Sequence, residues 1–589
     1  MQRDKITKKI EQIERVASTP EKITQSLTEV IDKFNIISSF KKIDFAKRSG
    51  ILASTLTRTL LLLPFLGANS IWNFIKGGLK KEEEGKKDAF YELKNNPKIN
   101  WRSLLLLIAK HFQYLVNQDC KEYIDIKNEV LRIKATIFDD SALEKTGKNI
   151  EGIGYIHDHV KDIHFLGYKL LVCGFWDGSS FIPIDFSLHK EKRDKSLKKA
   201  GQRLAKKKDK ILKVEKEMEV WQSTLEEKIE LQKAAEKAYE SKPNKVNGNK
   251  LVQRQKAVAR AKTLMEKLKT GLAQQKEQKQ FIENELQEIK SAFRYCGLKK
   301  EDYKEQFKKH RDRNTAGHKR AKESGHNKLE MVVKMLKRTV KRGFVPDYVL
   351  TDTWFFSYKL LRAIAEIGKN IRLVSMAMIG TAKFKILPMG RFMAPQEIIA
   401  KFQRTMSKTN RKYKAKYMQF QAEYQGIRVK MFIIKFGTHG SWRMLVTTDL
   451  DISFNKIIEV YKIRWAIEVF FKECKQYLLL GKCQSLDFDA QIADTTLTMI
   501  RFILLSYYKR IHYGTTIGGL FKQLKQSATE ENLLANISLY FIELLQIFAN
   551  LAGIDFITFY EELIRNEEAE KIISKIGIGL TKSEYQYAA

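Results

Sequence analysis

The chain has 589 residues, too many for one hydrophobic core, and this length predicts about two to four domains. Hydrophobic residues make up 43% of the sequence, enough to fill such cores. The 107 Lys and Arg residues outnumber the 69 Asp and Glu residues and leave a formal charge of +38. This surplus favours a polyanionic partner, with nucleic acid first, although a chain that uses lysine simply as its solvating residue would show it too.

The cysteines and the apolar stretches argue against a secreted or membrane protein. The five cysteines are scattered, without the short spacing of a zinc knuckle, and an odd number does not make a disulfide framework. We therefore expect a reduced, cytoplasmic protein. The chain begins with MQRDKITKKIEQIERV, which lacks the apolar core of a signal peptide. The most apolar stretch, Leu60–Leu66, is too short to span a bilayer and predicts a buried segment.

Residues 1–120 have a helical pattern, with apolar residues every three or four positions in Val30–Phe40 and Leu104–Val116. They form either a DNA-end-binding domain or a plain helical cap. Strands follow, at Val130–Phe138, Tyr168–Trp176 and Ser179–Phe186. Asp177 and Gly178 separate the last two and predict a tight hairpin.

Residues 191–295 are dominated by Lys, Glu, Gln, Ala and Leu, with one break at Ser241–Asn249. This pattern predicts an antiparallel coiled-coil hairpin with arms of about 45 residues that would reach roughly 65 Å. Its apolar seam is thin and runs through Ile211, Val214, Met218, Trp221 and Leu225. Such an insertion could clamp DNA, bridge subunits or contact a partner, and we favour the first two.

The second half of the chain alternates strands and helices. A strand at Tyr348–Thr351, a helix at Ser357–Ile367 and a strand at Ile371–Met378 precede a β-rich stretch and a periodic helix at 454–480. This order matches an α/β (α+β multidomain) fold with a ribonuclease-H-like mixed sheet as its catalytic core. The expected segments are a helical N-terminal domain (1–120), three core parts (121–190, 296–385 and 456–510), the helical hairpin (191–295), a β-rich insertion (386–455) and a helical C-terminal region that is a candidate for dimerisation (511–589).

Acidic residues lie at the ends of two of these strands. Asp139 and Asp140 close the first strand, and Asp352 closes the strand in VLTDTWF. Adjacent strand ends in this fold bring such residues together, where they can bridge metal ions about 3.5–4 Å apart. Because side chains alternate along a strand, Asp139 and Asp140 cannot both face the same cleft. One of them is a metal ligand, and the other is exposed or caps a turn.

The helix YKIRWAIEVFFKECK carries the third acid. At about 100° per residue, Tyr461, Arg464, Glu468 and Lys475 fall within an arc of about 60°, with Lys472 beside them. Ile463, Ile467, Phe470 and Cys474 fall on the far side, with Phe471 at the boundary. A solvated amphipathic face is one interpretation. The interpretation we favour is that Glu468 completes a metal site while Arg464, Lys472 and Lys475 hold phosphates.

This helix resembles the insertion-sequence-four-type DDE transposases, whose signature is Y-x2-R-x3-E-x6-K. Tyr461, Arg464, Glu468 and Lys475 match it at every spacing. The resemblance extends to DDS (139–141), to the block from Leu166 to Leu188, to DYVLTDTWF (347–355) and to WRMLVTTD (442–449). In this family the first acid usually precedes x-Ser/Thr, which favours Asp139, with Ser141 as the match, over Asp140. The long hairpin at 191–295 departs from the family pattern.

The resemblance implies a bacterial transposase that binds terminal inverted repeats of double-stranded DNA as a homodimer. It would cut with two Mg²⁺ ions, which Mn²⁺ can replace, held by Asp139, Asp352 and Glu468, and would join the freed 3′-hydroxyl to target DNA, through a hairpin in several members. Tyr461, Arg464 and Lys475 would grip the end phosphates. Trp442, or Trp465 in its place, would stack on a flipped base, although both also fit ordinary packing.

Three alternatives and a few further motifs stay open. The chain could be a metal-dependent nuclease or resolvase on the same fold, a domesticated transposase that only binds DNA, or a scaffold whose coiled coil carries the function.

The cluster His157, His159 and His164 predicts a loop without a structural metal. The basic run KKHRDRNTAGHKRAK at 308–322 fits a solvated helix or a phosphate contact equally well. No glycine-rich phosphate loop occurs, so no nucleotide cofactor is implied.

Overall fold

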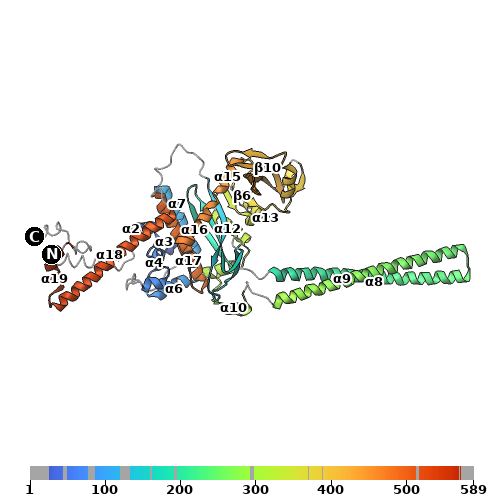
Figure 1. Ribbon diagram of the computed structural model, residues 1–589, viewed down its shortest axis with the longest axis horizontal. Coiled ribbons are helices and arrows are strands. Elements are labelled where there is room, and N and C mark those ends of the chain that lie inside the picture. The colour runs from blue at the N-terminus through green and yellow to red at the C-terminus, as the bar shows by residue number, and fades with distance from the viewer. Residues whose placement is uncertain are drawn as a thin grey trace. The chain divides into compact units, whose positions relative to one another are not determined.

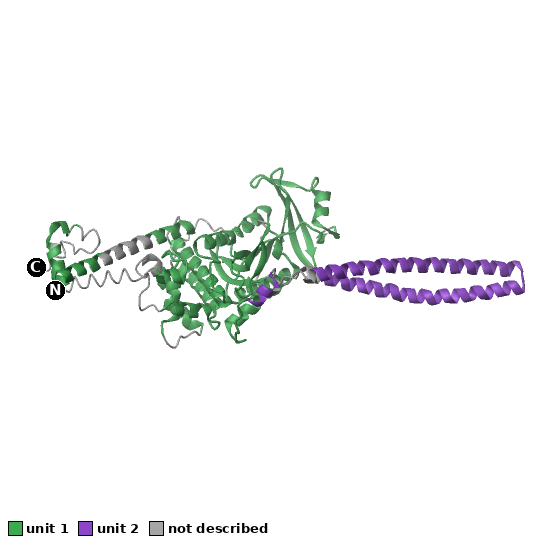
Figure 2. Ribbon diagram, turned by 60° about the horizontal axis from the view of Figure 1, so that its bottom comes forward, with its two compact units in different colours: residues 1–190, 306–589 green, residues 191–305 purple. Residues whose placement is uncertain are grey.

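The computed structural model describes residues 25–43, 50–76, 86–119, 133–158, 162–190, 195–291, 298–368, 370–387, 389–511, 516–569 and 571. The chain divides into two compact units. The first combines residues 1–190 and 306–589, and the second is residues 191–305 (Figure 2).

Helices come first in the chain, as the apolar periodicity predicts. They are α2 (Gln25–Lys33), α3 (Ile36–Lys42), α4 (Ala53–Leu62), α5 (Ile71–Lys76), α6 (Lys87–Asn95) and α7 (Trp101–Asp119). Helices α4, α6 and α7 pack against α17 (Phe488–Ile511), a helix from the other end of the first unit. The apolar residues Leu60, Leu61 and Leu62 are buried, which confirms that this stretch belongs to a core.

A mixed sheet of twelve strands forms the centre of the first unit. Its strands are β1 (Ala135–Glu144), β2 (Gly154–Asp158), β3 (Ile163–Trp176), β4 (Phe181–His189), β5 (Tyr348–Thr351), β6 (Arg372–Ala377), β7 (Phe384–Leu387), β8 (Arg391–Met393), β9 (Lys408–Asn410), β10 (Ala415–Tyr424), β11 (Ile427–Phe436) and β12 (Trp442–Thr447). Strand β1 lies between antiparallel β3 and parallel β5, and β5 pairs in parallel with β6. This arrangement confirms the mixed α/β core with a ribonuclease-H-like sheet.

Two features of the first strands differ from the sequence prediction. Strand β1 begins at Ala135 and continues to Glu144, because its whole length pairs with the long strand β3. Strand β2 was not predicted, and it forms a hairpin with the start of β3. His157 and His164 are therefore partners on neighbouring strands, with ring centroids 4.6 Å apart, and are not in a loop. His159 lies outside the described residues.

Helices cover both faces of the sheet (Figure 1). The helices of this part of the first unit are α11 (Ala316–Glu323), α12 (Lys328–Lys341), η3 (Thr353–Phe355), α13 (Tyr358–Ile367), α14 (Pro395–Phe402), α15 (Phe454–Lys462) and α16 (Trp465–Tyr477), and the short helix α10 (Lys300–Lys304) belongs to the second unit. On one face of β3, Phe175 packs against Phe344, just after α12. On the other face, a Cβ at Gly174 would meet the ring of Phe181, which packs on Phe470 of α16. Glycine is required there because no side chain would fit beneath that ring.

The β-rich stretch extends the same sheet. Beyond β6 the strands follow in the order β12, β11, β10, β7 and β8, and β9 pairs with β10. Alternation of buried and exposed residues along β10 matches a sheet with one covered face. Strand β12 then leads to α15 and α16, so the extension returns the chain to the core beside β1.

The second unit is a helical hairpin, described by itself. Helices α8 (Lys195–Ser241) and α9 (Lys245–Ser291) each have 47 residues and pack along one another. Ile211 is buried and Val214 and Met218 are half-buried, as the thin predicted seam requires. At the turn, the side chain of Asn244 accepts a hydrogen bond from the amide of Asn247 at 2.8 Å.

Two helices end the described chain, α18 (Ile517–Leu551) and α19 (Phe556–Arg565). Within the described residues no single helix is long and apolar enough to cross a membrane, although the bent pair Phe541–Leu551 and Phe556–Leu563, with 110° between them, meets that measure on length and composition. Cys173, Cys474 and Cys483 are buried free thiols, and the other two cysteines lie outside the described residues.

Candidate active site

Asp139 and Asp352 lie side by side where two parallel strands part. The register of β1 and β5 ends with Phe138 opposite Thr351, and each acid is the next residue on its strand. Side chains alternate between the two faces along each strand, so the residues that directly follow a matched pair point to the same face as each other. Thr351 is the last residue of β5, and the turn η3 carries the chain away directly after Asp352. Asp139 directly follows the end of the parallel pairing, but β1 continues to Glu144, so the prediction that Asp139 closes this strand is wrong.

The neighbouring acids Asp139 and Asp140 turn to opposite faces of the sheet. Asp139 pairs with Arg464, which directly precedes α16, and its Oδ2 accepts a hydrogen bond from Nη1 at 3.1 Å. Asp140 forms an ion pair with Lys328 at the start of α12. The register agrees, because Asp139 lies opposite Val172 and Asp140 opposite Leu171 on β3. Only Asp139 therefore shares a face with Asp352 and the acid-bearing helix.

The helix that carries Glu468 is divided in two. Helix α15 ends at Lys462 and α16 begins at Trp465. Across the break the amide of Arg464 donates to the carbonyl of Tyr461 at 3.1 Å, a tightened i to i−3 contact. The predicted single helix is thus interrupted, although its direction is kept because Arg464 remains in the right-handed helical region. This tightening shifts residues before the break relative to those after it.

The buried face of α16 agrees with the sequence pattern. Ile467, Phe470, Phe471 and Cys474 are buried, whereas Ile463 before the break is only half-buried. Glu468 is half-buried on the other side, and Lys472 and Lys475 are exposed. The Nζ of Lys475 donates to the Oγ of Ser141 at 2.8 Å, next to the paired acids. One face of α16 therefore enters the core, while the other presents charge to β1.

Arg464 lies between two of the acids. Its Nη1 contacts Asp139 and its Nη2 donates to Oε1 of Glu468 at 2.5 Å. Within the described residues no group of three or more His, Cys, Asp or Glu side chains is arranged to hold a metal ion. In this structure the Arg464 guanidinium lies between Asp139 and Glu468 and pairs with both.

The donor set nevertheless fits a divalent ion. Asp139, Asp352 and Glu468 all offer carboxylate oxygens, the ligands preferred by Mg²⁺ and Mn²⁺. Burial raises the pKa of Asp139 to about 7, and the nearby charges of Asp140 and Asp352 add to this against the attraction of Arg464. Arg464 supplies one positive charge beside Asp139 and Glu468, so the three acids together keep a surplus of negative charge that a divalent ion would offset. These acids would hold the ion once the arginine moves aside.

Two polar atoms beside the acids are buried without a partner. They are the hydroxyl of Tyr461 and the Nε of Arg464, within the part of the chain that the structure describes. The guanidinium carbon of Arg464 lies 5.6 Å from the ring centroid of Tyr461. Burial raises the pKa of Tyr461 to about 12, so its hydroxyl keeps its proton and remains a donor. Buried donors without partners mark places where a ligand can supply the missing acceptor.

The tryptophans are placed differently from one another. Trp465 is 61% exposed at the start of α16 and adjoins Arg464. Trp442 is half-buried at the start of β12, and β6 separates that strand from β5. Trp354, two residues after Asp352, is 67% exposed and was missed by sequence reasoning. The signal was present in DTWF, where a large aromatic follows a strand-end acid directly.

Comparison with known protein families supports the assignment of this arrangement to one class of proteins. Residues 315–503 match the family model described as a transposase DDE domain. The matched segment contains Asp352, Tyr461, Arg464 and Glu468 and begins after the strand with Asp139. A search of curated proteins found no match. Together with the ribonuclease-H-like sheet, the match supports a DDE transposase, a class of enzymes that act on DNA and generally use divalent metal ions.

Proposed function

We propose that the protein is an insertion-sequence-four-type transposase of a bacterial insertion sequence that cuts and joins DNA at the ends of its element. The observation that carries this proposal is the set of acids around Arg464. Asp139 and Glu468 both accept hydrogen bonds from Arg464. Asp352 and Asp139 each directly follow the last matched pair of β5 and β1. A nuclease or resolvase would also need the acids, but it would not need the Tyr461 and Arg464 donors beside them.

The three acids would hold two divalent ions, Mg²⁺ or Mn²⁺. Bound there, such ions activate the attacking oxygen and stabilise charge at phosphorus. Arg464 would then leave its carboxylates and donate to a phosphate of the transposon end, and the Tyr461 hydroxyl would donate beside it. Lys475, already next to Ser141, and the exposed Lys472 would neutralise the flanking phosphates.

The proposed reaction cuts one strand with water, leaving a 3′-hydroxyl and a 5′-phosphate. That 3′-hydroxyl would attack a phosphodiester of the opposite strand and expel the 3′-hydroxyl of the flanking DNA, which leaves a hairpin on the element end. Water would reopen the hairpin, and the regenerated 3′-hydroxyl would join target DNA. The enzyme would work as a homodimer on paired inverted repeats at the bacterial nucleoid. Helices α2–α7 are our candidates for end binding and α18–α19 for dimerisation. The helical hairpin would clamp DNA or bridge subunits.

The test uses the full chain on DNA that carries the sequences flanking its reading frame. We expect cutting at those ends in Mg²⁺ or Mn²⁺, while Glu468→Gln binds the same DNA without cutting it. Glu459→Gln is the matched control, since Glu459 lies on α15 and pairs at the surface with Lys412. Full cleavage by Glu468→Gln would overturn the assignment, and cutting of branched DNA without end specificity would favour a resolvase.

A further inference from the structure

The basic run at 308–322 separates into cations that hold the fold and cations that do not. Lys309 pairs with Asp487 at 2.6 Å, and Arg311 pairs with Glu151, Asp487 and Asp489 at 2.6 to 3.2 Å. Arg320 is buried and donates to the carbonyl of Phe186. These three cations are therefore not available to an external ligand.

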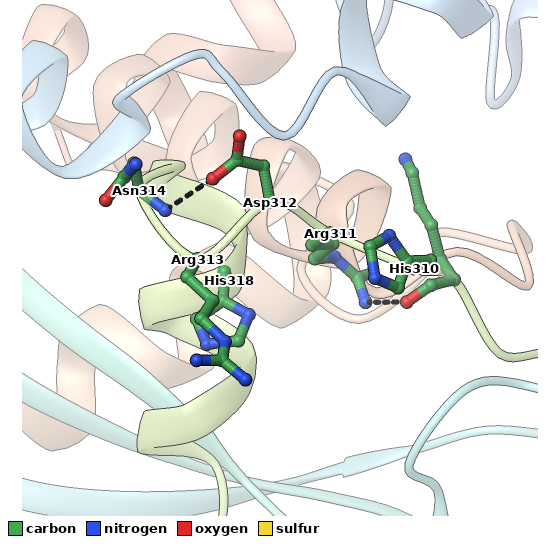
Figure 3. Close-up of a pocket in the computed structure, with 7 residues that line it drawn as sticks. His310, Arg311, Asp312, Arg313, Asn314 and His318 are labelled. Carbon is green, nitrogen blue, oxygen red and sulfur yellow. Dashed lines mark hydrogen bonds between the residues drawn. The ribbon is translucent and has the colours of Figure 1, made fainter.

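Arg313 and two histidines of the run line a hollow, together with the engaged Lys309 and Arg311. His310, Arg313 and His318 face a cavity of about 610 Å³ at the start of α11 (Figure 3). We call it the 310–318 pocket. Their side chains form no ion pair and no hydrogen bond with the residues that the structure describes, and His310 and Arg313 are exposed. The one acid in the lining, Asp312, accepts the amide of Asn314 at 2.8 Å and points away from Arg313 and His318 (Figure 3).

The loop that carries these basic side chains is held by hydrogen bonds within the protein. Its amides and hydroxyls are engaged, since the amide and Oγ1 of Thr315 both donate to the carbonyl of Asp312, at 3.0 and 2.6 Å. The amide of Gly317 donates to the carbonyl of Pro97 at 2.8 Å. A Cβ at Gly317 would lie 2.4 Å from Oδ1 of Asp489 and 2.8 Å from Pro97, so the loop sits directly against the core. A preformed loop lowers the ordering cost of binding.

We propose that the 310–318 pocket binds a phosphodiester of duplex DNA, outside the site formed by the three acids. A guanidinium and two imidazoles around one hollow are donors suited to phosphate oxygens. The acids nearest to the pocket, Glu151, Asp487 and Asp489, are already paired with Arg311. None of Asp139, Asp352 and Glu468 lines the pocket. The inference rests on the proposed function, because it assigns a second contact to the same DNA.

The test compares two single substitutions in the full chain. Arg313→Gln removes a pocket cation, and Lys319→Gln removes an exposed cation of α11 that does not line the pocket. Binding to a duplex is followed by fluorescence anisotropy in EDTA across a salt series. We expect Arg313→Gln to weaken binding roughly tenfold and to reduce the salt slope by about one. His310→Ala with His318→Ala should act in the same direction, and Lys319→Gln should have little effect.

Further measurements and variants separate failure of the pocket proposal from failure of the proposed function. Thermal unfolding checks that each variant folds, and Arg313→Lys, which keeps the charge, should regain most of the lost affinity. Equal binding by wild type, Arg313→Gln and Lys319→Gln would show that the 310–318 pocket does not bind DNA. The proposed function would stand if the wild type still cuts. If Arg313→Gln loses binding only of duplex RNA, or only of inorganic phosphate by calorimetry, the DNA assignment is wrong. A wild type that binds no duplex overturns both proposals.

Discussion

Two clusters in the first unit each gather three carboxylates around one arginine, and they differ in how completely that arginine is bound. Arg311 donates to Glu151, Asp487 and Asp489, and 3% of its side chain is exposed. Arg464 donates to Asp139 and Glu468, is 14% exposed, and leaves its Nε without a partner among the described residues.

The difference bears on our proposal that the second cluster, and not the first, is the active site. Buried charges are costly unless every charge is paired and hydrogen-bonded, and the cluster around Arg311 meets that condition with Lys309 as a second cation. The cluster around Arg464 does not, because Arg464 pairs with two of the three acids, and its Nε and the Tyr461 hydroxyl have no partner among the described residues. Buried donors of this kind, beside a group of acids, are positions where an external group can bind.

The largest expected effect tests which acids belong to the functional cluster. Asp139→Asn should reduce DNA cleavage at least about a thousandfold, since a metal ligand stabilises the transition state by several kcal/mol. Asp140→Asn, its matched control, should cost less than about tenfold, because its partner Lys328 lies on the opposite face. Single-turnover cleavage of a labelled end measures both. Equal losses would show that both acids serve the site, against the alternation along β1.

The next effect is on stability and tests the comparison directly. Arg311→Met should lower the free energy of unfolding by about 3–5 kcal/mol, since it leaves buried carboxylates without their counter-charge. Arg464→Met should lower it by less, because Arg464 pairs with two carboxylates, of which Glu468 is 32% exposed, whereas Arg311 pairs with three. Urea unfolding followed by tryptophan fluorescence gives both values. If Arg464→Met were as destabilising as Arg311→Met, the two clusters would be of the same kind.

A smaller effect concerns the metal. Arg464→Gln should tighten Mn²⁺ binding in the absence of DNA, by on the order of tenfold, since about 1 kcal/mol of competing ion pair is removed. The same variant should cut DNA more slowly, because it loses a phosphate donor. Electron paramagnetic resonance of Mn²⁺ titrated into the protein reports the affinity independently of cleavage. Unchanged or weaker Mn²⁺ binding would show that the arginine does not compete for the acids.

The smallest expected effect concerns the tryptophans near the three acids. Trp354→Ala should weaken binding to ends with an unpaired terminal base by about 1–2 kcal/mol, the range for one stacking contact, without changing stability. Trp442→Ala should instead lower stability, since that ring is half-buried at the start of β12. Anisotropy with paired and unpaired ends, alongside thermal unfolding, separates the two. Trp465→Ala shows whether the second exposed ring contributes.

The sequence predicted what local patterns determine. The helix face with Glu468, the acid at the end of β5 and the long hairpin all follow from short-range periodicity and turn residues. What it missed depends on distant partners. The length of β1 is set by pairing with β3, and the break at Ile463 and Arg464 coincides with the contact that Arg464 makes to β1. The 310–318 pocket required knowing that Arg311 and Lys309 are already engaged by residues near Asp487.

The parallel pair β1 and β5 also has a consequence for synthesis of the protein. Lys134, at the start of this pairing, contacts Asp347 across 213 residues of sequence, and Arg464 reaches Asp139 across 325. A nascent chain exposes Asp139 long before Asp352 and Glu468 have been made, and contacts this distant form late because of their loop-closure cost. The three acids therefore meet only after Glu468 has left the ribosome. A product that is truncated or stalled before this residue lacks the complete set of acids.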